Sequence, residues 1–220
     1  MSDQRTLLFA TESEASRQLA KLIDADILPL PSIQAPETFE EWRADALLGP
    51  ARARIVVASG FDDTPSRGED KPEAARTQGE LISLDERGWR QRFELPYLLW
   101  SFALGAAGQR CADGGAVVAV IQTPAALDAP GWTPEFAIAD GVFALVRSVA
   151  AAEGPRGVRA NLVTTPIGLV EGDLVAPAPP LTGFPGTIEG HVAGAIRTFL
   201  SPDAIGLTGR VLSADGGRSL

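Results

Sequence analysis

The sequence has very few of the residues that build metal sites, disulfides and most catalytic centres. Its 220 residues include one cysteine, Cys111, and one histidine, His191. A single cysteine excludes an internal disulfide, and one cysteine with one histidine excludes a Cys-His metal cluster of ordinary spacing. We therefore expect no metal site. A lone histidine at the start of a helix is more often a surface or cap residue than a general base, and Arg110 before Cys111 favours that thiolate only slightly.

The sequence also lacks excess positive charge and long apolar runs. It has 19 Lys and Arg against 28 Asp and Glu, a formal net charge of -9, which disfavours binding to nucleic acid and to anionic membrane surfaces. No apolar run approaches the ~18 residues that a membrane span needs. The segment Leu7–Ala10 is too short for the core of a signal peptide. We expect a cytoplasmic protein with neither nucleic acid nor membrane as a partner.

What is present is a regular alternation of buried strands and amphipathic helices. Apolar runs bounded by turn residues predict strands, and the stretches between them show helical periodicity. This alternation indicates right-handed βαβ units on a parallel sheet, an α/β fold in a single domain over residues 1–220. The predicted strands are Thr6–Ala10, Ala25–Leu30, Arg54–Ser59, Ala116–Ile121, Val158–Thr164 and Arg210–Ser213. The predicted helices are Glu14–Ile23, Glu37–Leu48, Asp85–Ala107, Pro134–Ala152 and Gly190–Leu200, with long loops at Phe61–Gly79 and Gly172–Gly186.

Two segments in the second half carry recognisable motifs. They read GVRANLV at Gly157–Val163 and LTGRVLSADGG at Leu207–Gly217. These resemble the GIRVNAV strand and the C-terminal YITGQVLSVDGG segment of the short-chain dehydrogenase/reductase (SDR) family. The order of a tryptophan-bearing helix, a GGAVVAVI strand and a further helix between Asp85 and Glu153 is similar to the family pattern. The resemblance implies a Rossmann-like doubly wound sheet and kinship with NAD(P)-dependent oxidoreductases.

The cofactor-binding motif of that family is not kept. A TGxxxGxG turn after the first strand lets the backbone approach the cofactor pyrophosphate, but the aligned stretch here reads FATESEAS, with Ala10, Glu14 and Ser16 at the glycine places. Side chains at the three glycine places narrow the space for the cofactor pyrophosphate, and the glutamates bring negative charge to the position of its phosphates. These residues also have a purely structural explanation. Thr11 or Ser13 can cap the next helix, and glutamates in the first turn interact favourably with the helix dipole. We expect no bound nicotinamide cofactor.

The adenosine side of the fold is also altered. After the second strand the chain runs Leu28-Pro29-Leu30-Pro31, which offers no charged residue to read a ribose. The segment from there to Arg54 is too short for a helix, a strand and a second helix, since helices take about 10 residues each and a strand about 5. We expect the sheet to be shortened after its second strand.

The catalytic residues implied by the resemblance are missing as well. The family's tyrosine and lysine, four residues apart on one helix face, correspond to Phe136 and Asp140, and its asparagine corresponds to Pro96. The serine corresponds to Thr123 by spacing or Gln122 by strand register. Phenylalanine has no proton to give, and an aspartate raises rather than lowers the pKa of a nearby acid. The proline-glycine after the sixth strand reads Thr165-Pro166.

Large aromatic residues mark a further surface. They are spaced by four, four and three on one predicted helix, which is first of all a packing pattern and, by the resemblance, also a contact between subunits. The predicted interface residues are Trp89, Phe93, Tyr97, Trp100 and Ala144.

Three functions follow from these observations. The first is a catalytically inactive SDR-like subunit that pairs with an intact SDR dehydrogenase in a hetero-oligomer. The second is an enzyme with an atypical site that uses Thr123, Gln122 and Asp140, either as an NAD(P)-dependent oxidoreductase or for chemistry without a cofactor. The third is a ligand-binding homo-oligomer.

Overall fold

The computed structural model describes residues 5–59, 85–123, 133–166 and 187–216 of the chain. Both predicted long loops, Phe61–Gly79 and Gly172–Gly186, lie wholly outside the described residues, as does the stretch that follows Thr123. None of the described helices is long and apolar enough to cross a membrane.

The strands form one parallel sheet, as the sequence predicts. Its order is β2-β1-β3-β4-β5-β6, and every neighbouring pair is parallel. Because helices cover both faces, the central strands are almost continuously apolar, and β1 is buried over its whole length. The strands are β1 (Thr6–Ala10), β2 (Ala25–Pro29), β3 (Arg52–Ser59), β4 (Cys111–Gln122), β5 (Arg159–Thr165) and β6 (Val211–Ser213).

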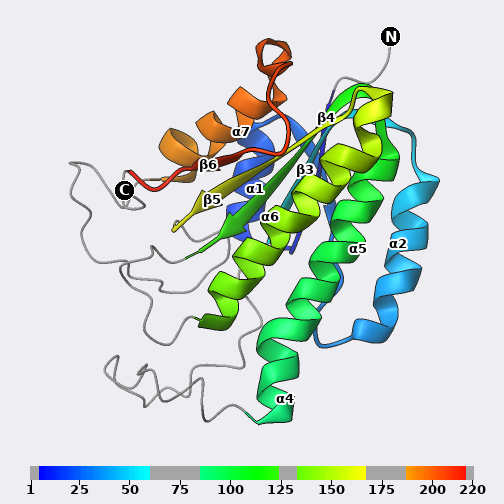
Figure 1. The fold of residues 1–220 in the computed structure, drawn as a ribbon, viewed down its shortest axis with the longest axis vertical. Helices are drawn as coiled ribbons and strands as arrows, with labels where there is room; N and C mark the ends of the chain where they lie inside the picture. Colours follow the sequence, from blue (N-terminus) through cyan, green and yellow to red (C-terminus); the bar gives the residue numbers. More distant parts are fainter. Residues whose placement is uncertain (1–4, 60–84, 124–132, 167–186, 217–220) are drawn as a thin grey trace.

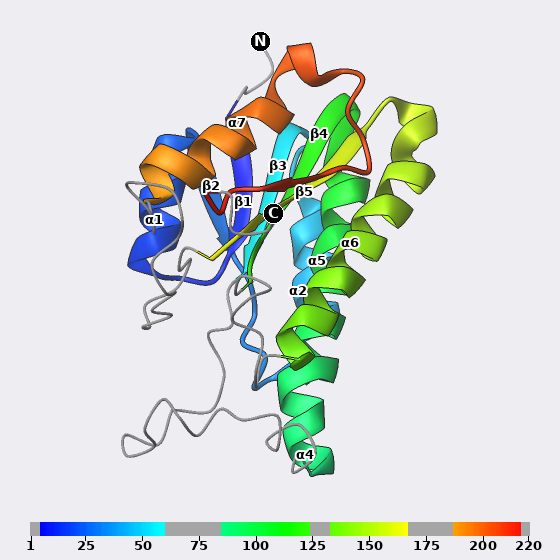
Figure 2. The same ribbon diagram turned by 60° about the vertical axis from the view of Figure 1, so that its left-hand side comes forward.

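Helices pack on both faces of this sheet, so the molecule has three layers (Figures 1 and 2). On one face lie α1 (Glu14–Leu22) and α7 (Ala193–Leu200), and on the other lie α2 (Phe39–Leu48), α5 (Leu95–Arg110) and α6 (Thr133–Glu153). A separate apolar core fills each interface between layers. The fold class predicted from the alternation of strands and helices is therefore confirmed.

The sheet is shortened after its second strand, which is also confirmed. The usual order of a doubly wound dinucleotide-binding sheet is 3-2-1-4-5-6, whereas here β2 is itself an edge strand. The chain returns from β2 to β3 through a short 3-10 turn, Pro36–Thr38, and the single helix α2. One strand and one helix of the usual arrangement are absent from this part of the chain, which the structure describes without a gap.

The helix predicted over Asp85–Ala107 is in fact interrupted. It consists of α4 (Glu86–Trp89), a π-helical turn at Arg90–Glu94, and α5. Pro96 has no N–H to donate to the carbonyl of Arg92, so the regular α-helical ladder cannot run through this point. The Leu95 N–H bonds instead to the Arg90 carbonyl, five residues back, and this wider turn absorbs the proline.

Strand β4 begins earlier than the sequence predicts. The stretch Gln109–Gly115 reads as a turn because of its glycines, but β4 starts at Cys111, with Gly114 at a positive φ of 73°. Its pairing with β3 shifts register between Arg52 and Arg54. The Arg156 guanidinium holds this irregular start, because it donates to the carbonyls of Gly108 and Cys111.

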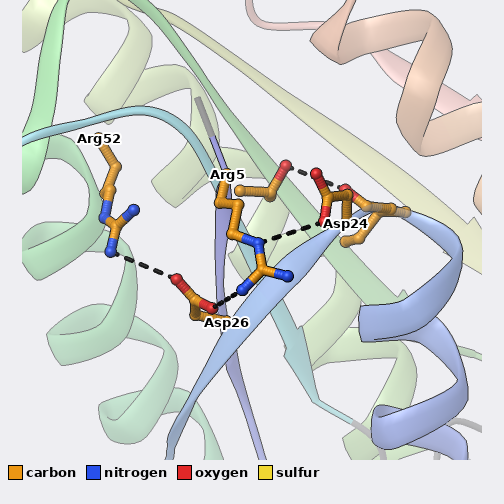
Figure 3. Close-up of polar contacts among 6 residues, drawn as sticks. Arg5, Asp24, Asp26 and Arg52 are labelled. Carbon is orange, nitrogen blue, oxygen red and sulfur yellow. Dashed lines mark hydrogen bonds and ion pairs between the residues drawn. The ribbon is translucent and has the colours of Figure 1, made fainter. Parts of the chain in front are cut away.

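Charged residues connect the amino ends of three neighbouring strands (Figure 3). The Arg5 Nη1 atom lies 3.1 Å from the Asp26 Oδ1 atom, and the Arg52 Nη2 atom lies 3.4 Å from Asp26 Oδ2. Arg5 also reaches Asp24, with 3.4 Å between Nε and Oδ1. The Arg5 pairs are exposed, and exposed ion pairs each stabilise a fold by about 0.2–1 kcal/mol. They close the end of the sheet away from the candidate site.

Candidate functional site

The candidate site lies at the carboxyl ends of the strands, at the point where the order of successive strands changes from one side of β1 to the other. From β1 the chain moves outward to β2 on one side, and β3 lies on the other side. In doubly wound folds a ligand crevice opens at such a switch point. The residues that end the strands there include Ala10, Ser59, Gln122 and Thr165.

In the first turn of α1, where a phosphate would bind in this fold, a side chain of the turn itself caps the helix. Ser13 is the N-cap, and its Oγ accepts the Ser16 N–H at 3.0 Å, while the two hydroxyl oxygens also lie 3.0 Å apart. Both serines are buried, and Ala10 is fully buried before them. Glu14 is exposed and lies 3.2 Å from Arg17 between its Oε2 and Nε atoms. The prediction that Ser13 can cap this helix is confirmed, and the Ser16 N–H, a first-turn donor of the kind that would face a phosphate, is bonded within the chain.

The end of β2 offers apolar groups where a ribose would be read. The Leu30 N–H donates to the Ala10 carbonyl at 3.0 Å, and the Leu30 side chain is buried. The Trp42 indole N–H from α2 donates to the Pro29 carbonyl at 2.7 Å, and its ring meets Phe9 edge-on at a centroid distance of 5.4 Å. Helix α2 takes the place of the missing strand and helix, and its Trp42 ring therefore packs against the carboxyl ends of β1 and β2.

Polar side chains remain at the ends of β4 and β5. Gln122 is the last residue of β4 and is 3% exposed, and it pairs in register with the fully buried Thr165 of β5. Thr123 lies one residue beyond the strand, half-buried, and its N–H donates to the Thr165 carbonyl at 2.8 Å. The Thr165 hydroxyl donates to the Ala214 carbonyl at 3.0 Å. Both candidates for the family's serine are thus adjacent, with Gln122 the one inside the sheet.

The residues at the tyrosine and lysine places lie on α6 near this end of the sheet. Phe136 is half-buried, and Asp140 is exposed to solvent. Pro96, at the asparagine place, is half-buried near the start of α5. Neither Phe136 nor Pro96 carries a group that can move a proton.

A buried ion pair beside Phe136 escaped the sequence analysis. Glu135 is 3% exposed by side chain, and its Oε1 accepts from the Arg92 Nη2 at 2.8 Å and from Nε at 3.2 Å. The pair joins the π-helical turn to the first turn of α6. Glu135 reads in sequence as an ordinary first-turn acid, and its partner is 43 residues away, so no local spacing could have identified it.

The predicted interface residues divide into exposed and buried ones. Trp89 is 39% exposed and its ring contacts the Phe93 ring at a centroid distance of 4.7 Å and a tilt of 31°, and the Phe93 ring stacks on Tyr97 at 6.1 Å. Phe93 and Tyr97 are half-buried, whereas Ala144 is exposed on α6. Trp100 is 4% exposed and belongs to the core beneath the helices. The interface prediction is therefore wrong for Trp100, which packs inward because it lies on the sheet-facing side of α5.

The surroundings of Cys111 and His191 indicate structural rather than catalytic roles. Burial raises the pKa of the Cys111 thiol to about 11, against the opposing charge of Arg156. Arg110 does not activate this thiol, since its guanidinium donates to the Ala46 and Pro50 carbonyls at the end of α2. The His191 Nδ1 accepts the Thr187 N–H at 3.0 Å at the start of a helix, which confirms a capping role. No group of three metal-ligating side chains occurs among the described residues.

Comparisons with known proteins place this geometry in a fold family. No family model and no curated protein sequence matches the chain, but solved structures do. A mutant short-chain dehydrogenase/reductase of Serratia marcescens superposes with a TM-score of 0.69 at 16% identity, covering 98% of both chains. The chain has the fold of the short-chain dehydrogenases.

Two further structures support this assignment of the fold. FabI from Alistipes finegoldii matches with a TM-score of 0.69 at 18% identity over 99% of this chain and 90% of its own. The enoyl-(acyl-carrier-protein) reductase of Anaplasma phagocytophilum matches with a TM-score of 0.64 at 14% identity over 97% of this chain and 91% of its own. The Rossmann-like fold that the sequence motifs imply is confirmed across nearly the whole chain.

Proposed function

We propose that this chain is a non-catalytic subunit with the short-chain dehydrogenase fold, which pairs with a catalytically intact relative to form a hetero-oligomeric oxidoreductase. The observation that carries the proposal is the first turn of α1, where the Ser13 side chain accepts the Ser16 N–H that would face a pyrophosphate in this fold. An enzyme of this fold that cannot hold its cofactor has no hydride to transfer.

Structures with this fold and a bound cofactor supply the contrast. The reductase from Anaplasma phagocytophilum was solved with NAD, and a metagenomic blue fluorescent protein was solved with NADPH. In this chain the exposed carboxylate of Glu14 lies at the end of the helix that would face the negative phosphates. Like charges repel in that position, so the electrostatics and the filled space oppose cofactor binding together.

The second support is the absence of a proton donor at the acid/base place. Phe136 has no ionisable group, and Asp140 is exposed to solvent. The nearby carboxylate of Glu135 accepts two bonds from Arg92 and ties two helical segments together. The Oε1 atom of Glu135 therefore serves as a link between the π-helical turn and α6.

The third support is the outer surface of α5 and α6. The two helices lie side by side on one face of the sheet (Figures 1 and 2). Leu98 is 41% exposed and Trp89 39% exposed on the α4–α5 side, and Ala144 is exposed on α6. Exposed aromatic and aliphatic residues beside small ones suit a helix-to-helix contact between subunits.

One observation favours an alternative in which the crevice still binds a small ligand. Gln122 and Thr165 remain buried polar residues at the strand ends, where ligands bind in this class of fold. A ligand-binding homo-oligomer, or an oxidoreductase with an atypical site that uses Gln122, Thr123 and Asp140, would employ them.

Calorimetry with NAD, NADH, NADP and NADPH at millimolar concentration tests the proposal. We expect no saturable heat for this protein, while an intact short-chain dehydrogenase measured in parallel binds its cofactor. The triple variant Ala10→Gly, Glu14→Gly, Ser16→Gly reopens the turn but gains no dehydrogenase turnover, because Phe136 still offers no proton. Micromolar binding to the unaltered protein would end the proposal and leave the oxidoreductase alternative.

A further inference from the structure

The helical segment that leads into α7 begins with two residues that bond to each other's backbone. Thr187 is the N-cap: its Oγ1 accepts the Gly190 N–H at 2.9 Å, and its carbonyl accepts the His191 N–H at 3.0 Å. In return, the His191 Nδ1 accepts the Thr187 N–H at 3.0 Å. The N–H groups of Thr187 and Gly190 are therefore satisfied reciprocally by side chains, as in a capping box.

This cap differs from the usual capping box in the group that accepts the N-cap N–H. That group is ordinarily a Glu or Gln side chain at the third helical position, which here is Gly190 and has no side chain. The first turn is π-helical over Ile188–Val192, and the Ala193 N–H bonds to the Ile188 carbonyl, five residues back. The imidazole of the fourth residue, His191, supplies the acceptor instead.

An imidazole acceptor makes the cap depend on protonation. Histidine is the side chain whose charge ordinarily changes between pH 5 and 8, and His191 is half-buried, so solvent reaches part of it. A neutral imidazole can accept a hydrogen bond at Nδ1, whereas the protonated ring donates from both nitrogens and cannot accept. On protonation the Thr187 N–H loses its partner, and a positive charge is placed in the first turn, where the helix dipole is also positive.

The charged residues near this turn do not restore the lost acceptor. Among the described elements, α1 and α7 pack against the turn. Helix α1 carries Glu14, Arg17 and Lys21, of which Glu14 and Arg17 pair with each other at 3.2 Å, and α7 carries Arg197 in its last turn. Glu189 of the turn itself is exposed, so its attraction for a protonated ring is screened by salt.

We propose that His191 makes the start of this helical segment pH-sensitive: the cap is closed while the ring is neutral and opens when the ring takes up a proton. Ile188 and Val192 are buried in the core that the segment shares with α1 and the sheet, so opening of the cap loosens the turn against α1. Because the first turn of α1 borders the candidate site, a fall in pH weakens the packing beside that site. The device does not require a bound cofactor, and it stands apart from the proposed function.

Amide NMR on the full chain tests the proposal. In a titration from pH 8 to pH 5, we expect the Thr187 amide signal to shift along the same curve as the His191 ring signals. The protection of the Thr187 amide from hydrogen exchange, corrected for the intrinsic pH dependence of exchange, should fall about fivefold across this range. The internal control is the Asp203 amide, which the Ser201 hydroxyl caps and whose protection should stay constant.

Two variants separate a pH-sensitive cap from a merely structural one. His191→Gln keeps a side-chain acceptor that does not titrate, so the protection of the Thr187 amide should stay within about twofold of its starting value from pH 8 to pH 5. His191→Ala removes the acceptor and should lower this protection about fivefold at both pH values.

Three results overturn the proposal. In the first, the His191 ring stays neutral down to pH 5. In the second, the ring titrates but the Thr187 amide neither shifts nor loses protection. In the third, His191→Gln keeps the full pH dependence, which assigns it to another group.

Discussion

At the scale of the single residue, the pKa of the Cys111 thiol is set by burial and not by its neighbours in the sequence. Its pKa is raised from an ordinary 9.0 to about 11 by burial, which outweighs the nearby Arg156. Arg110, adjacent in sequence, points its guanidinium to the end of α2 instead. Solvent exclusion disfavours the thiolate, so this cysteine is suited to packing and not to nucleophilic attack.

The raised pKa of Cys111 predicts a loss of stability at alkaline pH. Above pH 9 the thiol ionises in the unfolded chain but stays protonated in the folded one until about pH 11, so the unfolded state gains free energy as the pH rises through this window. Between pH 8 and 10.5 the protein should lose about 2 kcal/mol more than the Cys111→Ala variant. Urea unfolding of both proteins at the two pH values measures this difference, and equal losses would contradict the prediction.

At the scale of the element, the contact between α5 and α6 depends on a glycine. A Cβ atom added to Gly141 would lie 2.5 Å from the Tyr97 Cε2 atom, whereas nothing lies within 4 Å of one added to Gly105 of α5. Both glycines lie inside helices, where alanine is intrinsically favoured by roughly 0.5–1 kcal/mol. The Gly141 position is therefore fixed by the Tyr97 ring, and the Gly105 position is open.

These two glycines provide a matched pair of substitutions. We expect Gly105→Ala to raise the free energy of unfolding by about 0.5–1 kcal/mol. Gly141→Ala should lower it by about 1–2 kcal/mol, because the Tyr97 ring must move from its stack on Phe93. Thermal and urea unfolding of the two variants give the comparison. If both substitutions stabilise the protein equally, Tyr97 does not pack on α6 as described.

The elements themselves were largely predictable, and the exceptions have physical reasons. Strand β1 matches its predicted bounds because its apolar run is bounded by polar residues. The start of β4 was missed because Gly114 and Gly115 resemble a turn, while Arg156 from a distant segment holds it in the sheet. The π-helical turn before Pro96 depends on hydrogen bonds that periodicity does not reveal. The Arg92–Glu135 pair is likewise a tertiary contact.

At the scale of the whole molecule, the two ends of the sheet differ in character. Ion pairs of Arg5, Asp26 and Arg52 close the amino ends of the strands (Figure 3). The carboxyl ends retain buried Gln122 and Thr165 but lose the phosphate turn. The framework was predictable from sequence because it depends on apolar pattern. The candidate site was argued position by position, because its residues lie on several different strands and helices.

The last prediction concerns assembly with an intact relative. Light scattering on this protein co-expressed with an intact short-chain dehydrogenase from the same source should reveal a mixed dimer or tetramer, since Trp89 and Leu98 expose apolar surface on the outer side of α4 and α5. Leu98→Asp places a charge on that surface and should abolish co-purification. The matched control is Leu48→Asp on α2, where the leucine is 83% exposed and the assembly should persist. If the protein remains a monomer both alone and with the relative, the subunit proposal fails and ligand binding at the strand ends becomes the explanation to pursue.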